Sequence, residues 1–189
     1  MKKHILLTLC ALFTLVSNTF AQIQNGDIIT ISSNNYYLAV NDNNGIVAVT
    51  MSKPTKACLW VVTVNNNQYS FTSVAASEAG KSAGLARNNN NNGLTLAATP
   101  TAFKFSTNYY ETADNQTIGR LYCEVKSDNW WGSTSYKFIH YTSKQNQAGS
   151  WGISSQSSNT STTPSLLTLE QWTKKVEKGG LVGAFNIDN

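Results

Sequence analysis

The sequence predicts an all-β protein, and three observations support this prediction. Short segments in which apolar and polar residues alternate recur along most of the chain, with the period of half-buried strands. Runs of asparagine and glycine separate them, and both residues favour the left-handed backbone of tight turns. Two of these runs, Asn43-Asn44-Gly45 and Asn91-Asn92-Gly93, precede similar alternating segments. The sequence therefore predicts a β-hairpin that is repeated in tandem.

The N-terminal segment, Met1–Ala21, has the features of an export signal. A basic start at Lys2-Lys3 precedes the apolar stretch Ile5–Val16, and Thr19-Phe20-Ala21 has the small residues of a cleavage site. The apolar stretch is too short for a membrane anchor, and a lipoprotein signal at Cys10 is disfavoured by the bulky residue before it. We expect cleavage before Gln22. The mature chain would then be periplasmic or extracellular, either free or at the cell surface.

The predicted strands are short and follow one another at regular intervals. They are Asp27–Ser32, Tyr36–Val40, Ile46–Thr50, Leu59–Val64, Tyr69–Val74, Ser82–Arg87, Leu94–Ala97, Phe103–Ser106, Leu121–Lys126, Tyr136–Thr142 and Trp151–Ser154. Turn-forming runs separate several of them, at Asn41–Gly45, Asn65–Asn67 and Asn88–Gly93. This spacing is typical of a β-sandwich or a β-barrel.

The tandem repeat favours the barrel. Aligning the two Asn-Gly turns places the aromatics Trp60 and Phe103 at the ends of two units. A third unit follows if Leu121–Val125 corresponds to Tyr37–Val40 and Trp151 is the closing aromatic. The three closing aromatics are then separated by two similar intervals. Three units of roughly 45 residues resemble the β-trefoil, a fold known from ricin-type lectins, fascin and Kunitz-type soybean inhibitors.

The resemblance implies a β-trefoil-like barrel over residues 22–154, with a two-sheet β-sandwich as the alternative. Ricin-type lectins carry a Gln-x-Trp signature in each unit. The matching places here read Cys58-Leu59-Trp60, Thr101-Ala102-Phe103 and Gly149-Ser150-Trp151. The glutamine is absent each time, so none of that family's sugar-binding residues is transferred to this chain.

The composition changes after the third unit. Residues 155–165 are rich in serine, threonine and asparagine, as flexible linkers are. Beyond them, Leu166–Trp172 has the pattern of a strand or of a short helix, and Gly179–Phe185 begins another apolar run. Residues 166–189 are therefore expected to be a strand that returns to the domain or the start of a second domain, truncated here.

The charge of the mature chain is small. Loss of Lys2 and Lys3 with the export signal leaves 12 of the 14 basic residues against 10 acidic ones, and Lys174, Lys175 and Lys178 form the one basic cluster. So small an excess gives little attraction for a polyanion. The sequence therefore predicts no nucleic-acid partner, and it has no later segment long enough to span a membrane.

Catalytic groups are scarce. His140 is the one histidine of the mature chain, and its alternating surroundings predict a half-buried strand position. The acids are scattered singly, and Asp42 and Asp128 sit in turns, where aspartate ordinarily caps the backbone. Neither paired carboxylates nor a phosphate-binding loop is present, and His140 with two cysteines is too small a set for a metal site. We expect a non-enzyme without a cofactor.

The two mature cysteines, Cys58 and Cys123, are well separated in the sequence. In an oxidising compartment they could form a disulfide. Such a bond would stabilise the fold by lowering the conformational entropy of the unfolded chain. The favoured alternative is that each is a small buried residue of its own strand, because Cys58 alternates with Trp60 and Val62.

Adjacent aromatic pairs are the best candidates for a binding site. Neighbouring residues of a strand face opposite sides, so a pair with one ring in the core leaves the other outside. An exposed ring can stack on a sugar while nearby amide or carboxylate groups bind its hydroxyls. The predicted ligand-binding residues are Asp128, Asn129, Trp130, Trp131, Tyr36 and Tyr109. The alternative is that these aromatics cap an open end of the barrel.

These features predict a secreted, non-catalytic binding module that recognises a glycan or another surface polymer through exposed aromatics. One alternative is a protein-interaction or protease-inhibiting domain that presents Lys144 on a loop over Ser143–Ser150. Another is the leading domain of a longer secreted protein. The oligomeric state stays open, since no part of the sequence bears on it.

Overall fold

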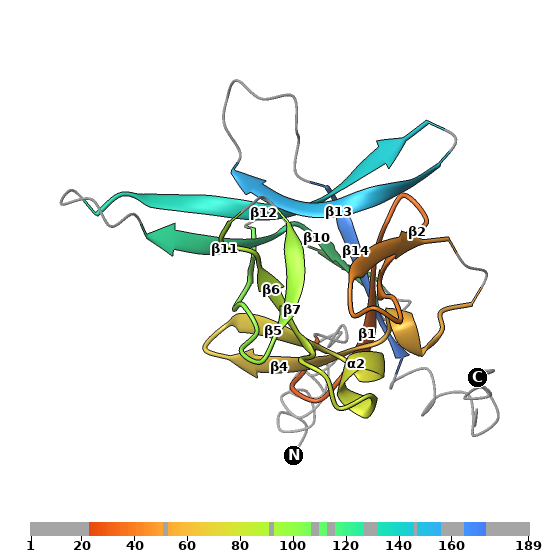
Figure 1. Cartoon of the computed structure of the whole chain (residues 1–189). Coiled ribbons are helices and arrows are strands. Elements are labelled where there is room, and N and C mark those ends of the chain that lie inside the picture. Colours follow the sequence, from red (N-terminus) through yellow and green to blue (C-terminus); the bar gives the residue numbers. More distant parts are fainter. Residues whose placement is uncertain are drawn as a thin grey trace, which may run out of the picture.

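The computed structural model describes residues 23–50, 53–90, 93–106, 110–112, 116–126, 132–145, 147–155 and 165–172 (Figure 1). Most of them lie in antiparallel strands, so the all-β prediction is confirmed. The strands are β1 (Ile28–Ser33), β2 (Tyr36–Val40), β3 (Ile46–Val49), β4 (Trp60–Asn65), β5 (Gln68–Ser73), β6 (Gly84–Arg87), β7 (Leu94–Ala97), β8 (Lys104–Phe105), β9 (Tyr110–Thr112), β10 (Gln116–Gly119), β11 (Leu121–Lys126), β12 (Thr134–Lys144), β13 (Gln147–Ser155) and β14 (Leu167–Gln171). Two short helices accompany them, η1 (Lys56–Cys58) and α2 (Val74–Glu78).

The strands connect into a barrel-like sheet. A ten-stranded sheet has the order β7-β6-β5-β4-β1-β14-β10-β9, with β2 paired to β1 and β3 paired to β2 beside this path. A four-stranded sheet has the order β13-β12-β11-β8. The two sheets join at three places. The strand β11 follows β10 with one residue between them, Tyr69 of β5 bridges to Phe103 beside β8, and Gly93 beside β7 bridges to Gly152 of β13. These connections arrange the strands in a nearly closed ring, which the two face-to-face layers of a sandwich would not produce.

Three hairpins extend from this ring. They are β2–β3, β6–β7 and β12–β13, and their returning strands contact one another. The first two enclose the predicted Asn-Gly turns, with Val40 opposite Ile46 and Arg87 opposite Leu94, so a hairpin lies at each of the two predicted places. Three hairpins thus project from one barrel-like sheet.

The first turn differs from the prediction in one detail. The left-handed residue is Asn44, with φ of 61°, whereas Gly45 is not left-handed. The amide of Gly45 instead donates a hydrogen bond to Asn41 Oδ1 at 2.8 Å. Asn41 therefore caps this turn, whereas the sequence predicts this role for Asp42.

Asparagine also forms two of the tightest connections. Asn34 and Asn35 between β1 and β2 have φ of 51° and 64°, and Asn66 and Asn67 between β4 and β5 have φ of 49° and 59°. Two consecutive left-handed residues define the type I′ turn, whose twist matches that of the paired strands. Several of the asparagines therefore occur where a tight turn needs a left-handed backbone.

The third unit departs from the predicted alignment. Trp151 lies in β13 opposite Tyr141, so it belongs to the third hairpin and does not close the unit. Leu121–Val125 pairs with β8 and β12 and is therefore not the counterpart of β2. The last strand of the third unit is β14, which pairs with β1 on one side and with β10 on the other. The barrel thus includes Leu167–Gln171, which agrees with the closing strand that was one of the two alternatives expected for residues 166–189.

The predicted loop over Ser143–Ser150 is also different. Thr134–Lys144 and Gln147–Ser155 pair along most of their length, with Lys144 opposite Gln147. The sequence does not predict the full length of this hairpin. The outer halves of its two strands are mostly exposed, so they lack the apolar alternation that marks a half-buried strand.

The core lies inside the ring. Its largest fully buried side chains are Trp60, Phe71, Phe103, Ile29, Ile31, Leu38, Leu85, Leu121, Ile139, Ile153, Leu167 and Leu169. Two tryptophans from other strands also hold β2 in place. Trp60 Nε1 donates to the carbonyl of Leu38 at 3.0 Å, and Trp151 Nε1 donates to the carbonyl of Tyr37 at 3.2 Å.

The two cysteines are separate thiols rather than a disulfide. Both are buried, Cys58 at the end of η1 and Cys123 in β11. The expected strand position is therefore wrong for Cys58. Burial raises the pKa of both thiols above the ordinary value of 9.0, because the thiolate loses its hydration. Such thiols are poor nucleophiles at neutral pH.

The raised thiol pKa values predict a loss of stability at alkaline pH. The unfolded chain ionises both thiols near pH 9.0, whereas the folded chain keeps them protonated. Their contribution is therefore complete below pH 9.0 and is lost as the pH rises through the folded pKa values. Each thiol removes up to about 1.4 kcal/mol from the free energy of unfolding per pH unit in that window. Urea unfolding from pH 7 upward measures this slope.

The control for this prediction is the Cys58→Ala, Cys123→Ala double variant. Its free energy of unfolding should fall less steeply in the same window. A residual decline is expected at higher pH, because burial also raises the pKa of Tyr141 above 10.0. Identical slopes in the two proteins would contradict the prediction.

Candidate functional site

Five of the six predicted ligand-binding residues, Tyr109 and the segment Asp128–Trp131, lie outside the described residues. The sixth, Tyr36, is in β2 and half-buried. Its ring stacks on Tyr141 of β12, with the ring centroids 4.8 Å apart and an angle of 20° between the planes. One face of Tyr36 is therefore covered by Tyr141.

Tyr141 is the centre of a structural contact between β2 and the third hairpin. Its ring also packs on Trp151, at 5.3 Å, and its hydroxyl accepts a hydrogen bond from the amide of Gly149 at 3.0 Å. A Cβ at Gly149 would overlap the carbonyl of Thr142 and the Tyr141 ring. This cluster fixes β2 against β12 and β13, so we assign it to packing.

A different group of aromatics lies on the outer face of the four-stranded sheet. Residues of β11 alternate between buried and more exposed positions, and Tyr122 falls on the more exposed side. Phe138 of β12 lies directly opposite Tyr122, and Tyr136 lies opposite Glu124. The Tyr122 ring is 5.6 Å from Tyr136 and 5.4 Å from Phe138. We call these three residues the aromatic face.

The aromatic face is accessible. Tyr136 is 50% exposed, and Tyr122 and Phe138 are partly exposed. Cross-strand contacts of this kind hold aromatic rings in fixed positions. The arrangement offers a ligand a preformed apolar surface with phenol groups on it.

Polar groups border the aromatic face on both sides. Lys104 of β8 lies opposite Tyr122, and its Nζ is 2.7 Å from Glu124 Oε1. The hydrogen bond to Glu124 raises the pKa of Lys104. On the other side, Ser154 Oγ lies 3.4 Å from His140 Nδ1. These groups supply hydrogen-bond donors and acceptors, and the Lys104–Glu124 ion pair is neutral overall.

The sequence contained a signal for this face. Tyr136 and Phe138 are next-but-one neighbours in an alternating segment, so both point to the same side of a strand. They are not adjacent in the sequence, so the predicted aromatic pairs do not include them. The predicted pair Trp130-Trp131 belongs to the segment that connects β11 and β12, the same two strands that carry the aromatic face.

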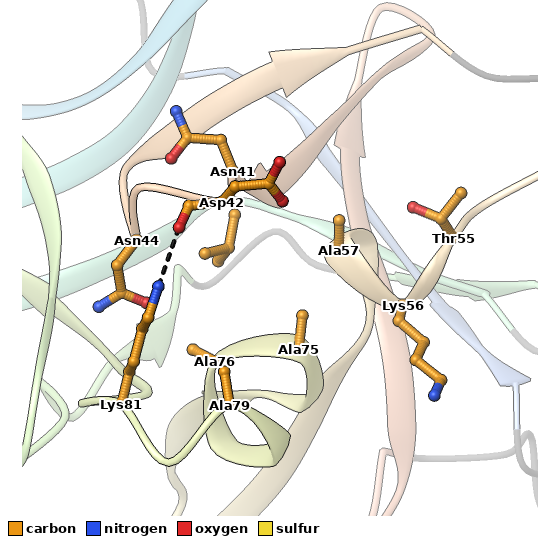
Figure 2. Close-up of a pocket in the computed structure, with 11 residues that line it drawn as sticks. Asn41, Asp42, Asn44, Thr55, Lys56, Ala57, Ala75, Ala76, Ala79 and Lys81 are labelled. Carbon is orange, nitrogen blue, oxygen red and sulfur yellow. Dashed lines mark hydrogen bonds between the residues drawn. The ribbon is translucent and has the colours of Figure 1, made fainter. Parts of the chain in front are cut away.

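A pocket of about 330 Å³ lies elsewhere in the fold, between the β2–β3 turn, η1 and α2 (Figure 2). Its lining residues are Val40, Asn41, Asp42, Asn44, Thr55, Lys56, Ala57, Ala75, Ala76, Ala79 and Lys81. Ligand pockets have volumes of about 300–1,000 Å³, so this one accommodates a small molecule. No pattern in the sequence predicts this pocket, because its walls come from three separate segments.

Helix α2 forms one wall because of its sequence. The hydroxyl of Ser73 accepts a hydrogen bond from the amide of Ala76 at 3.3 Å and so caps the helix N-terminus. Ala75, Ala76 and Ala79 present only methyl groups, which leaves space beside the helix (Figure 2). A lysine follows, and Lys81 Nζ donates to the carbonyl of Asp42 at 2.9 Å.

Within the described part of the chain, no three His, Cys, Asp or Glu side chains are grouped closely enough to hold a metal ion. His140, the histidine predicted in a strand, lies in β12 and is half-buried there. In the same residues, no helix has the length and apolar character needed to cross a membrane.

No family model and no curated protein sequence matches this chain. Among solved structures, the chain is similar to a lectin from Polyporus squamosus, crystallised with a human-type influenza-binding epitope. The two are 15% identical, with a TM-score of 0.46 over 79% of this chain and 50% of the lectin chain. The chain thus spans half the length of that lectin.

Proposed function

We propose that the protein is a secreted, non-catalytic module that binds a glycan on the aromatic face. The observation that carries this proposal is the position of Tyr136, which is 50% exposed on a rigid sheet beside two further rings, Tyr122 and Phe138. Neighbouring exposed rings form a contiguous apolar patch, and such patches mark interaction sites more often than single exposed apolar residues do.

The chemistry of this face suits a sugar chain. The C–H face of a sugar ring packs on an aromatic ring, and its hydroxyls donate to or accept from neighbouring polar groups. Glu124, Lys104, His140 and Ser154 lie along the border of the rings and offer both kinds of group. The neutral Lys104–Glu124 pair favours a polymer of low charge, because a charged polymer would gain little there.

The export signal and the aromatics predicted at Trp130 and Trp131 remain part of this proposal. In the sequence, the segment that holds them joins β11 to β12, the two strands that carry the aromatic face. The protease-inhibitor alternative has less support. Lys144 is paired with Gln147 in a tight hairpin, whereas an inhibitor must present an extended loop to the protease.

The test is binding of the secreted chain to a glycan array and to insoluble polysaccharides. We expect Tyr136→Ala with Tyr122→Ala to weaken binding at least about tenfold, the equivalent of 1.4 kcal/mol, because the apolar contact is lost. Pull-down assays and isothermal titration calorimetry measure the change. A second variant, Trp130→Ala with Trp131→Ala, tests whether the predicted tryptophans take part.

The matched control is Leu166→Ala, since Leu166 is the other strongly exposed large apolar residue of the described chain, at 44%. Its binding should equal that of the wild type. The proposal fails if no glycan binds, or if the Tyr136→Ala, Tyr122→Ala protein binds as tightly as the control.

A further inference from the structure

The pocket beside α2 shares no residue with the aromatic face and is built by other elements. We propose that it is a second binding site, which accepts one neutral sugar residue such as the end of a glycan chain. This inference rests on the proposed function, since it names the part of a glycan that the pocket would hold. The observations that support it are the walls, the polar groups and the charges of the pocket.

The two main walls differ in polarity. Ala75 and Ala76 of α2 face the β2–β3 turn together with Ala79, which directly follows the helix, and Ala57 of η1 forms a third side (Figure 2). Methyl walls provide contact to an apolar surface but no room for a bulky side chain or a long aliphatic chain. The ligand therefore has one flat apolar face of modest size.

The opposite wall is rich in hydrogen-bonding groups. Asp42 is exposed, and its carboxylate projects from the turn on the side of Ala57 (Figure 2). Asn41 is exposed beside it, and its Oδ1 is already used by Gly45, which leaves its amide nitrogen as a donor. Asn44 Oδ1 is buried and has no hydrogen-bond partner among the described residues. A ligand here needs several hydroxyl groups, which both donate and accept.

The charges around the pocket are balanced. Lys56 Nζ lies 3.1 Å from Glu78 Oε2, so its charge is compensated by a residue outside the lining. The other two charged residues of the lining are Lys81, which is positive, and Asp42, which is negative. The side chain of Lys81 donates a hydrogen bond to the backbone carbonyl of Asp42. The two charges offset each other, so the pocket has little net attraction for either a cation or an anion. A polyhydroxylated neutral molecule fits this balance better than either.

The pocket is held in shape before any ligand arrives. Asn44 Nδ2 donates to the carbonyl of Ser82 at 3.1 Å, which joins the β2–β3 turn to the segment after α2. Lys81 makes the second such connection, and the Asn41 cap fixes the turn itself. A rigid site loses little entropy when it binds a small ligand.

These residues are distinct from the Gln-x-Trp signature. Cys58 occupies the place of the glutamine, is fully buried and does not line the pocket. The polar groups come instead from the turn before β3 and from the segment that follows α2. The pocket therefore stands on its own geometry and not on the trefoil resemblance.

The experiment is titration of the full secreted chain with a panel of monosaccharides, followed by calorimetry and by saturation-transfer NMR. Neutral hexoses and N-acetylhexosamines should bind at least about tenfold more tightly than glucuronic acid or glucosamine. Asp42→Ala removes the acceptor and Ala75→Leu fills the cavity, and each should weaken binding of the neutral sugar at least about tenfold. Asn43→Ala, in the same turn but outside the lining, is the matched control and should bind as the wild type does.

The inference is overturned if no neutral sugar binds, if a charged sugar binds more tightly, or if Asp42→Ala and Ala75→Leu leave binding unchanged. Its failure is distinguishable from that of the proposed function. Tyr136→Ala should weaken polysaccharide binding and leave monosaccharide binding intact, because the two sites share no residue. Polysaccharide binding without monosaccharide binding would remove the pocket alone, and loss of both would remove the glycan function.

Discussion

A chain that ends at Ser165 will not fold cooperatively, because it lacks β14. This strand lies between β1 and β10, with Leu169 opposite Ile31 on one side and opposite Thr117 on the other. Its removal opens the ring and leaves two neighbouring strands with unpaired backbone groups, which promotes aggregation. The strand is thus part of the barrel, although a linker-like segment precedes it in the sequence.

The size of the effect follows from burial. Leu167 and Leu169 are both fully buried, and loss of each such side chain costs about 2–5 kcal/mol. Together with the lost strand pairing, this approaches the whole stability of an ordinary domain, about 5–15 kcal/mol. Circular dichroism and thermal unfolding of residues 22–165 and 22–189 measure the difference. A cooperative transition at the same temperature in both proteins would contradict the prediction.

A substitution in the full-length chain separates the strand's packing from the effect of truncation. Leu169→Ala should lower the free energy of unfolding by about 2–5 kcal/mol. Thr168→Ser changes the adjacent, half-buried residue of β14 and should stay within about 1 kcal/mol of the wild type. Equal effects of the two substitutions would mean that β14 does not pack as described.

The parts of the fold that depend on local chemistry could be predicted from the sequence. Asparagine adopts the left-handed backbone at low cost, so the turns at Asn44 and at Asn66-Asn67 were visible as composition. Alternation then located β2, β7 and β11 with the bounds that the structure has. Turns and alternation are properties of a few neighbouring residues, which explains why they can be read from the chain.

The partners of those strands could not be predicted. The pairing of β14 with β1 joins residues from the two ends of the barrel sequence, such as Ser32 and Thr168, and no local pattern encodes it. The closing place of the third unit is held by Leu167 and Leu169 rather than by an aromatic. The conspicuous Trp151 belongs to the hairpin instead, which misdirected the alignment of that unit.

The candidate sites also combine features that the sequence predicts with neighbours that it does not. The aromatic face combines β11 with β12, and its rings were predictable as aromatic but not as neighbours across two strands. The pocket depends on alanines of α2, and alanine gives no signal in a sequence because it is common both in cores and on surfaces. A pocket that exists because its wall residues have small side chains can be recognised only from the three-dimensional structure, since its walls come from distant segments.

The second large effect is expected for Trp60→Ala. Trp60 is the largest of the fully buried side chains, and its indole donates to the carbonyl of Leu38 at 3.0 Å. Truncation leaves a cavity and an unsatisfied buried carbonyl, so the free energy of unfolding should fall by about 3–5 kcal/mol. Because Leu38 belongs to β2, the variant should also loosen the first hairpin. Urea unfolding, with hydrogen exchange of the β2 amides, measures both effects.

Two further variants distinguish the causes of this loss. Trp60→Phe keeps most of the apolar volume but removes the donor, and an intermediate cost of about 1–3 kcal/mol would isolate the hydrogen bond. Tyr136→Ala removes a comparable aromatic ring that is half exposed, and its free energy of unfolding should stay close to that of the wild type. The same variant is expected to lose glycan binding, so the two aromatics separate stability from recognition. A cost for Tyr136→Ala equal to that of Trp60→Ala would mean that the aromatic face serves packing rather than binding.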